Sequence, residues 1–171
     1  MWLTGLSGAG KSTLAYELRN RLLISDTPSV VLDGDRIRSG LCSDLGFAPQ
    51  DRRENVRRAA EVAKLILESG NIAIVALISP TQDDRQLARR IIGVPNFVEV
   101  YCQCPLEICE GRDVKGLYRL ARSGGISQFT GISAPYEPPL EPDVVVNTAA
   151  SSLAECVGEL LSFIQARQAD R

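Results

Sequence analysis

Strand-like and helix-like segments alternate along this chain of 171 residues, and that alternation predicts an α/β fold. The links between the segments are short, as in βαβ units, so we expect a mostly parallel sheet flanked by helices in three layers. The segment Asn71–Ser79 is apolar throughout, as a strand covered on both faces should be. The length suits one domain with a real hydrophobic core, so we expect a single domain over residues 1–171.

The elements can be placed from apolar spacing and from helix-end signals. The expected helices have apolar residues on one face and cover residues 11–23, 50–70 and the chain from about 152 onward. Asp51 with Glu54, and Ser152 with Glu155, have the spacing of a capping box, and Gly70 would end the middle helix. The expected strands are Met1–Thr4, Ser29–Asp35, Asn71–Ser79, Asn96–Cys104 and Pro142–Thr148.

One stretch, Gly111–Pro139, breaks this alternation. It is basic, rich in glycine and proline, and has no strong apolar period, so we expect it to be irregular. A long irregular segment in a compact domain is more often functional than accidental.

Composition excludes several classes of function. A net charge of −2 argues against a nucleic-acid binder held by bulk electrostatics. No apolar run is long enough to span a membrane, and no signal peptide is expected. The chain has no histidine, which excludes imidazole-ligated zinc and histidine-based triads. Its five cysteines form no CxxC pair, which favours reduced, buried thiols in a cytoplasmic protein.

The sequence GLSGAGKST, Gly5–Thr13, satisfies the P-loop pattern GxxxxGK[ST] between an expected strand and an expected helix. Glycines let successive backbone N–H groups turn inward toward phosphate oxygens, and the helix N-terminus adds partial positive charge. Lys11 would reach the β- and γ-phosphates, and the Ser12 hydroxyl would bind Mg²⁺. We therefore predict a P-loop NTPase fold with a nucleoside triphosphate bound by Gly5, Leu6, Ser7, Gly8, Ala9, Gly10, Lys11, Ser12 and Thr13.

Other features narrow the class of P-loop protein. A GTPase would need an Asn-Lys-x-Asp motif, and no asparagine here precedes an aspartate by three positions. Small size and the basic irregular segment favour a small-molecule kinase with a lid. Asp33 and Asp35 end an expected strand, where ligands of open parallel sheets bind. The two acids could serve Mg²⁺ and the acceptor hydroxyl, or either could simply cap the next helix.

Six motifs downstream of the P-loop occur together and in order. They are "LDGD" with "IR" two residues on, "DLGF", "DRRENVRR", "ISP", "RDVKGLY" and "FTGISAPYEPP". With them the chain resembles the adenylylsulfate kinase (APS kinase) family from the P-loop to about Thr148. The resemblance implies ATP and Mg²⁺ as cofactors and the 3′-hydroxyl of adenylylsulfate as phosphoryl acceptor, giving 3′-phosphoadenylylsulfate (PAPS).

The family's residue roles transfer to matching positions. By this resemblance Asp35 is the general base, and Asp33 supports Mg²⁺ through water or orients Asp35. The residues implied in binding adenylylsulfate are Asp35, Arg38, Phe47, Arg52, Asn55, Ile78, Ser79, Lys115, Leu117 and Phe129. The chemistry agrees, because arginine forks suit the anionic phosphosulfate and aromatic rings suit the flat adenine.

The resemblance also makes residues 111–136 a lid. Its cations Arg112, Lys115, Arg119 and Arg122 could close over the triphosphate, with Arg112 assigned to ATP. Elsewhere in the chain, Arg58 is expected to be a solvated surface residue.

The chain departs from the usual family pattern at a few positions. Arg36 replaces asparagine after "DGD", Thr81-Gln82 replaces Tyr-Arg after "ISP", and Val114 replaces proline in the lid. Two alternatives stay open: a domain that only senses PAPS, and another small P-loop kinase. A homodimer and a fused or associated ATP sulfurylase are expectations from the family.

Overall fold

The computed structural model describes residues 1–169 and contains one five-stranded parallel sheet in the order β2-β3-β1-β4-β5. The strands are β1 (Trp2–Thr4), β2 (Ser29–Asp33), β3 (Ile72–Ala76), β4 (Glu99–Gln103) and β5 (Val144–Asn147). Each lies inside a segment in which the sequence predicts a strand. Strand β1 is central, since Trp2 pairs with Val75 on one side and with Glu99 on the other. The predicted α/β class is confirmed.

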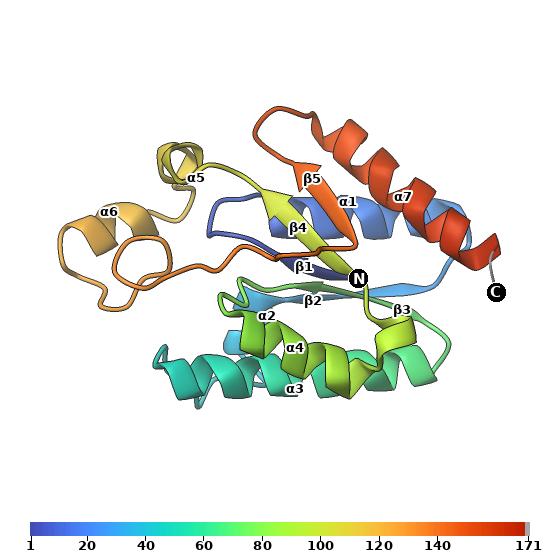
Figure 1. The fold of residues 1–171 in the computed structure, drawn as a ribbon, viewed down its shortest axis with the longest axis horizontal. Coiled ribbons are helices and arrows are strands. Elements are labelled where there is room, and N and C mark those ends of the chain that lie inside the picture. The colour runs from blue at the N-terminus through green and yellow to red at the C-terminus, as the bar shows by residue number, and fades with distance from the viewer. Residues whose placement is uncertain (170–171) are drawn as a thin grey trace.

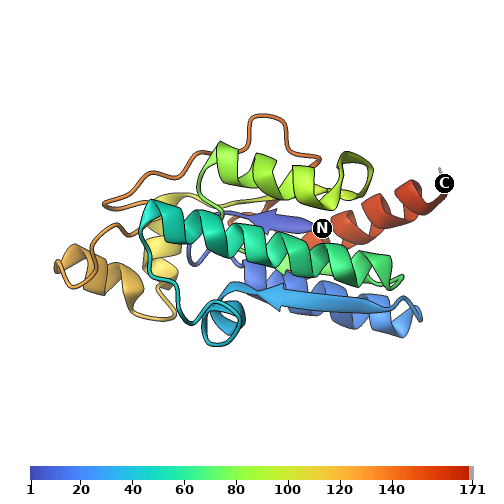
Figure 2. The same ribbon diagram turned by 90° about the horizontal axis from the view of Figure 1, so that it is seen from below.

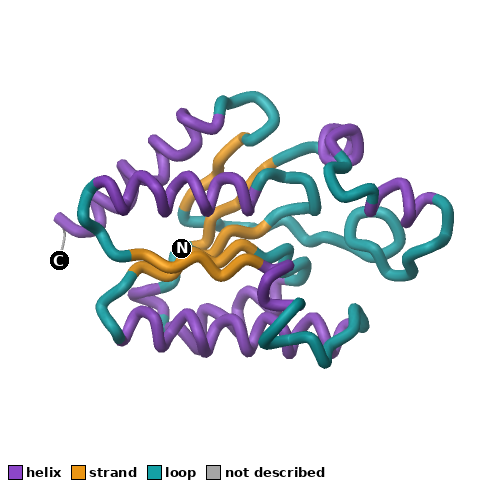
Figure 3. The backbone as a smooth tube through the Cα atoms, turned by 180° about the vertical axis from the view of Figure 1, so that it is seen from behind, coloured by secondary structure: helices purple, strands orange, loops and turns teal. Residues whose placement is uncertain are grey.

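Helices cover both faces of the sheet, as Figure 1 and Figure 3 show. Helices α1 (Lys11–Ile24) and α7 (Leu153–Ala169) pack on one face. The other face carries α2 (Gly34–Arg38), α3 (Pro49–Glu68) and α4 (Gln82–Ile92), with a 3-10 turn at Val94–Asn96. Figure 2 shows α3 and α4 running alongside each other. None of the helices in the described range 1–169 is both long and apolar enough to cross a bilayer.

The sheet separates two hydrophobic cores, because successive side chains of a strand point to opposite faces. In β1, Trp2 packs into the core under α3 and α4, whereas Leu3 packs into the core under α1 and α7. The same alternation places Val75 and Ile74 of β3 in different cores. All five cysteines are buried with free thiols, as predicted.

Helix-end predictions succeed at one helix and fail at another. At α7, the Ser152 backbone N–H donates to the Glu155 carboxylate at 2.8 Å and the Glu155 N–H donates to Ser152 Oγ at 3.3 Å. This is the predicted capping box. The box predicted at Asp51 and Glu54 is wrong, since α3 begins at Pro49, whose missing N–H and fixed φ suit the first helical position.

The expectation of an irregular segment after Gly111 is also partly wrong. Helix α5 (Leu106–Arg112) runs into it, and α6 (Leu117–Arg122) forms inside it. The Asp113 carboxylate accepts hydrogen bonds from the Tyr118 and Arg119 N–H groups in the first turn of α6, at 3.0 and 3.1 Å. These helices are too short to show an apolar period. Figure 1 shows both of them beyond the end of the sheet that carries the β1–α1 loop.

Candidate active site

A cavity of about 690 Å³ lies where the carboxyl ends of the strands meet the lid. Its walls come from the phosphate-binding loop (Gly5–Gly10), the start of α2, α3, the end of β3, the lid and the β5–α7 turn. It is lined by every residue implied in adenylylsulfate binding: Asp35, Arg38, Phe47, Arg52, Asn55, Ile78, Ser79, Lys115, Leu117 and Phe129. Lys11, Ser12, Thr13 and Asp33 line the same cavity.

The phosphate-binding loop requires glycine where the chain passes close to other backbone. Gly8 has φ +76°, and a Cβ added there would lie 2.8 Å from the Cys109 carbonyl oxygen. A Cβ on Gly5 would lie 2.7 Å from the Cys102 carbonyl oxygen. Other side chains at these positions would force the loop away from its neighbours. The spacing of the motif therefore reflects packing as well as phosphate binding.

Lys11 is the first residue of α1 and lies across this loop. Its Nζ donates to the carbonyl oxygens of Gly5 and Leu6 at 2.9 and 2.7 Å, and the residue is 8% exposed. Burial lowers the pKa of Lys11 to about 8, because removing the ammonium from water disfavours its charged form. A phosphate group entering the loop would offer that charge a stronger partner than two carbonyls.

Asp33 has two hydrogen-bonding tasks. Its Oδ2 accepts from Ser12 Oγ at 2.6 Å, and its Oδ1 accepts from the Asp35 backbone N–H at 3.1 Å, which caps α2. The capping interpretation of Asp33 is thus correct and compatible with a role at the site. A hydroxyl and a carboxylate side by side are the hard oxygen donors that suit Mg²⁺ when substrate phosphates complete the shell.

Asp35 lies in the first turn of α2 and forms an ion pair with Lys115 of the lid. The lid is therefore in contact with the residue implied as base. Asp35 and Lys11 line one cavity although they come from different helices. A shared cavity is the minimum that phosphoryl transfer between two bound substrates requires.

An aromatic ring and two arginines form another wall. The Arg38 guanidinium carbon lies 4.4 Å from the centroid of the Phe47 ring, and Arg52 Nε donates to the Phe47 carbonyl at 2.8 Å. Arg52 also donates to Thr130 Oγ1 at 3.0 Å and to the Gln128 carbonyl at 2.6 Å, both in the lid. The two arginines thus hold the Phe47 loop, and Arg52 joins it to the lid.

Asn55 and Phe129 complete that wall. Asn55 is 4% exposed, and within residues 1–169 its Oδ1 has no hydrogen-bond partner. A buried unpaired polar atom is costly, so its place in the cavity wall points to a ligand as partner. Phe129 is buried and its ring meets Tyr118 edge-on at 5.0 Å.

The lid cations divide into two pairs. Arg112 donates to the Gly8 carbonyl at 3.3 Å and to the Thr148 carbonyl at 2.6 Å, so it lies against the phosphate-binding loop. Lys115 contacts Asp35, as described. Arg122 instead pairs with Glu110 at 2.8 Å, and neither it nor Arg119 lines the described cavity. Of the four lid cations, Arg112 and Lys115 therefore lie at the cavity, whereas Arg119 and Arg122 lie away from it.

Some predicted ATP-binding residues lie off the cavity. Gly5, Leu6 and Ala9 do not line it, although Ser7, Gly8 and Gly10 do. The Ala9 carbonyl accepts from Thr148 Oγ1 at 2.9 Å. Further residues for which the sequence predicts no role line the cavity, among them Tyr118, Thr130, Thr148, Ser151 and Leu153. Thr148 could have been found, because it ends an expected strand as Asp35 does.

The prediction that Arg58 is merely solvated is wrong. Its guanidinium binds both oxygens of Asp44, at 2.7 and 2.8 Å, and the Leu41 carbonyl at 3.0 Å. It also pairs with Glu54 at 2.9 Å. Arg58 therefore fastens the loop that leads to Phe47 onto α3. Only a tertiary contact, invisible to local pattern, distinguishes this arginine from a solvated one.

The departures from the family pattern have local explanations in part. Thr81 Oγ1 accepts from the Asp84 N–H at 3.2 Å and caps α4, and Gln82 Oε1 accepts from Arg85 at 2.6 Å. Val114 is 88% exposed at the edge of the cavity. Arg36 is exposed and does not line the described cavity.

Comparison with known proteins identifies the family of this chain. The adenylylsulphate kinase family profile matches residues 1–147. An adenylyl-sulfate kinase of Acaryochloris marina is 53% identical over 167 residues, covering 98% of this chain and 82% of that protein. One from Geotalea daltonii is 51% identical with the same coverage.

Solved structures similar to this chain include members of the same family. The Mycobacterium tuberculosis APS kinase CysC, in complex with AMPPNP and APS, has a TM-score of 0.93 and 43% identity, over 96% of this chain and 95% of that one. A gluconokinase from Sinorhizobium meliloti, with a TM-score of 0.61 over 94% of this chain and 87% of that one, is 17% identical and shares the fold alone. This chain belongs to the adenylylsulphate kinase family.

Proposed function

We propose that this chain transfers the γ-phosphoryl group of ATP to the 3′-hydroxyl of adenylylsulfate, which yields PAPS and ADP. The observation that carries the proposal is that Lys11 and Asp35 line one cavity. That cavity also contains arginines and aromatic rings suited to a phosphosulfate and an adenine. Membership of the family supports the same reaction.

The nucleotide is held mainly by main-chain groups. The backbone N–H groups of the phosphate-binding loop and the N-terminus of α1 attract the phosphates, and Lys11 moves its ammonium from the Gly5 and Leu6 carbonyls onto them. Arg112 borders the same loop. Ser12 and Asp33 would hold Mg²⁺ together with the phosphates. When bound, Mg²⁺ neutralises charge that develops on the transferred group.

Adenylylsulfate is held by side chains. Arg38 and Arg52 bind its phosphosulfate, and Asn55 Oδ1, which lacks a partner, accepts from a hydroxyl or amino group of the nucleotide. Phe47 and Phe129 flank the adenine. Ile78 and Ser79 form the adjoining wall, and Lys115 and Leu117 close the pocket from the lid.

The reaction needs one proton acceptor. The Asp35 carboxylate accepts the proton of the 3′-hydroxyl as that oxygen attacks the γ-phosphorus. The bond between the γ-phosphorus and the bridging oxygen breaks, and ADP leaves with the electron pair. Lys115 holds the Asp35 side chain under the lid until the sugar hydroxyl arrives.

A domain that only senses PAPS is disfavoured. Such a domain has no need of a working phosphate loop, yet Gly5, Gly10, Lys11 and Ser12 are intact and Asp35 faces the cavity that they adjoin. A kinase for another small molecule would leave the acceptor wall of Arg38, Phe47 and Arg52 without a purpose.

The proposal includes a cytoplasmic homodimer, supported by the family resemblance. Light scattering on the purified chain tests the dimer, and a mass of 18.6 kDa in solution would contradict it. A single domain over residues 1–171 and a link to an ATP sulfurylase stay predictions.

One assay tests the reaction itself. The chain is offered Mg-ATP with adenylylsulfate, AMP, adenosine, gluconate or shikimate, and ADP release is followed. Of the five acceptors, we expect only adenylylsulfate to give rapid ADP release. ³¹P NMR of its product should show a phosphate at the 3′ position. Faster turnover of a sugar acid, or no turnover of adenylylsulfate, would contradict the proposal.

A further inference from the structure

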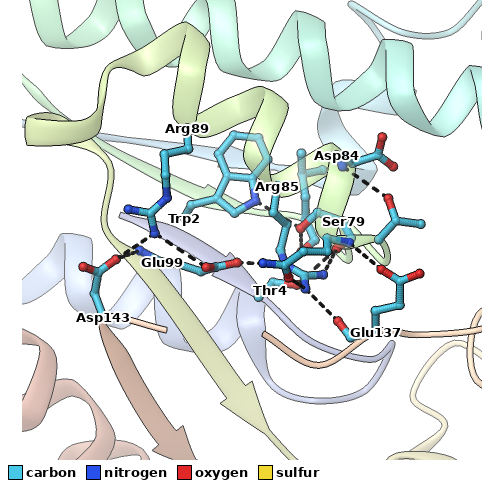
Figure 4. Close-up of polar contacts among 12 residues, drawn as sticks. Trp2, Thr4, Ser79, Asp84, Arg85, Arg89, Glu99, Glu137 and Asp143 are labelled. Atoms are coloured by element: carbon cyan, nitrogen blue, oxygen red, sulfur yellow. Dashed lines mark hydrogen bonds and ion pairs between the residues drawn. The ribbon is translucent and has the colours of Figure 1, made fainter. Parts of the chain in front are cut away.

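One fully buried cation lies behind the part of the cavity wall that contains Ser79. Arg85 of α4 is 1% exposed, and it is not among the residues that line the described cavity. Burying a guanidinium is expensive unless its charge and its N–H groups find partners. Figure 4 shows Arg85 between Ser79, Glu99 and Glu137. A residue at this depth acts on the reaction only through what it holds.

The Arg85 guanidinium contacts three separate parts of the fold. Its Nε lies 2.7 Å from Glu99 Oε1 in β4, an ion pair that lacks hydrogen-bond geometry. Its Nη1 donates to the Ser79 carbonyl at 2.8 Å. Its Nη2 donates to Gln82 Oε1 at 2.6 Å and to the Glu137 carbonyl at 2.7 Å. A planar fork with five donors can make all these contacts, whereas an ammonium cannot.

Ser79, whose carbonyl accepts from Arg85, is under backbone strain. Ser79 has φ +39°, a conformation that residues with a Cβ rarely adopt and that persists only where surroundings enforce it. Ser79 is 3% exposed and lines the cavity within the acceptor segment, Ile78–Pro80. Its hydroxyl accepts from Trp2 Nε1 at 3.0 Å, and its carbonyl accepts from Arg85. Arg85 therefore helps to enforce the strained backbone of the cavity wall.

Glu137, whose carbonyl also accepts from Arg85, is the residue that follows the lid. The Glu137 N–H donates to the Pro80 carbonyl at 2.8 Å, and the Glu137 carboxylate accepts from the Gln82 N–H at 2.6 Å. Arg85 adds the bond to the Glu137 carbonyl. Next to it, Tyr136 OH lies 3.0 Å from Thr4 Oγ1 at the end of β1. The C-terminal root of the lid is thus fastened beside the acceptor segment.

We infer that Arg85 is a positioning residue that holds the acceptor segment and the root of the lid in fixed positions relative to each other. In this way it sets the affinity for adenylylsulfate. The inference rests on the proposed function. Among the described residues, Arg85 makes no contact with the phosphate-binding loop, so its loss should affect adenylylsulfate much more than ATP.

Arg89 provides a matched control. It lies one turn further along α4 and contacts the same Glu99 at 3.6 Å, as well as Asp143 at 3.3 Å. Figure 4 shows it on the opposite side of Glu99 from Arg85. It has no contact with Ser79 or Glu137 among the described residues. If only the ion pairs with Glu99 mattered, substitution of Arg85 and substitution of Arg89 should have the same effect on KM. If Arg85 positions the acceptor segment, only its substitution should raise KM for adenylylsulfate.

The experiment compares Arg85→Lys with Arg89→Lys and measures KM for each substrate while the other is saturating. Arg85→Lys should raise KM for adenylylsulfate about 10-fold and change KM for ATP less than about 2-fold, because a small misplacement of one wall weakens binding there. Arg89→Lys should leave both KM values within about 2-fold of the unaltered chain.

If Arg85→Lys fails to fold, judged by the fluorescence of Trp2, the double variant Arg85→Gln with Glu99→Gln removes both buried charges and must show the same split between substrates. An unchanged KM for adenylylsulfate, an equal rise for both substrates, or an equal effect of Arg89→Lys would overturn the inference.

A substrate-free readout separates this inference from the proposed function. Amide hydrogen exchange at Glu137, whose N–H is bonded to Pro80, should be faster in Arg85→Lys than in Arg89→Lys. Equal exchange in the two variants would overturn the inference even where adenylylsulfate is turned over. Failure of the unaltered chain to use adenylylsulfate would overturn the proposed function and leave the exchange comparison standing.

Discussion

The two ends of the cavity are built in different ways. The phosphate end comes from one continuous stretch, Gly5–Thr13, and presents mainly backbone N–H groups and a helix terminus. The acceptor end comes from α2, the loop before α3, α3 itself, the acceptor segment and the lid, and presents side chains. Local sequence specifies the first, whereas the second exists only once distant segments have packed together.

This difference has consequences for substitution. Backbone donors cannot be mutated away singly, so the phosphate end is vulnerable mainly at its glycines and at Lys11. At the acceptor end each side chain is a separate contact, and several depend on supports outside the cavity. Arg58 holds the loop before Phe47, and Arg85 holds Ser79. Loss of one acceptor contact should therefore weaken one substrate, while loss of Lys11 should disable transfer.

The largest effect is expected for Lys11→Ala. Removing the Lys11 ammonium, which lies across the phosphate-binding loop, should lower kcat/KM for ATP about 1000-fold, because both binding and charge stabilisation in the transition state are lost. The measurement is steady-state kinetics with saturating adenylylsulfate. Lys64→Ala, an exposed change on α3, is the control and should be neutral. Comparable activity of the two variants would contradict the assignment of Lys11.

The next effect tests the junction of the two ends. Asp35→Asn should lower kcat by about 100-fold or more, within the range of about 100- to 10,000-fold expected for loss of a general base, and leave ATP binding within about 2-fold. Turnover and binding of an ATP analogue by calorimetry are measured on the same preparation. Near-normal turnover would show that another group accepts the proton.

A smaller effect is expected at the acceptor wall. Arg52→Lys keeps the charge but loses the fork that holds Phe47, Thr130 and Gln128, so KM for adenylylsulfate should rise about 10-fold while KM for ATP stays within about 2-fold. Arg53→Lys, the neighbouring residue, which does not line the described cavity, is the matched control. Equal effects on both substrates would erase the distinction between the two ends.

The smallest effect is a dependence on pH at the phosphate end. Burial lowers the pKa of Lys11 to about 8, so the free enzyme loses this charge as pH rises through that value. kcat/KM for ATP, which reports the free enzyme, should be constant near pH 7 and fall by several-fold toward about pH 9. A flat profile over that range would mean that the ammonium keeps its charge despite burial.

The same contrast explains what the sequence could predict. The P-loop, the strands and the paired acids at the end of β2 follow from local spacing and from the rule that ligands bind at strand carboxyl ends. Thr148 obeys the same rule, because it ends an expected strand and lines the cavity. The positions of Phe47 and Phe129 in the cavity follow from the family resemblance. Without it, each phenylalanine would be expected to pack in the hydrophobic core.

Other features lie beyond local pattern. The Asp51–Glu54 capping box fails because Pro49 already starts α3, and the Glu54 carboxylate binds Arg57 and Arg58 instead. Helices α2, α4, α5 and α6 were not anticipated as separate elements, as most are short or strongly polar. The partners of Arg85 lie up to 52 residues away in sequence, so its role emerges only from the packed fold.

The most direct test is a crystal structure with adenylylsulfate and an ATP analogue that cannot transfer its terminal phosphoryl group. We predict the 3′-oxygen within about 3 Å of the Asp35 carboxylate and facing the terminal phosphorus, with Lys11 bound to phosphate. A 3′-oxygen turned away from Asp35, or the two substrates in separate cavities, would contradict the account.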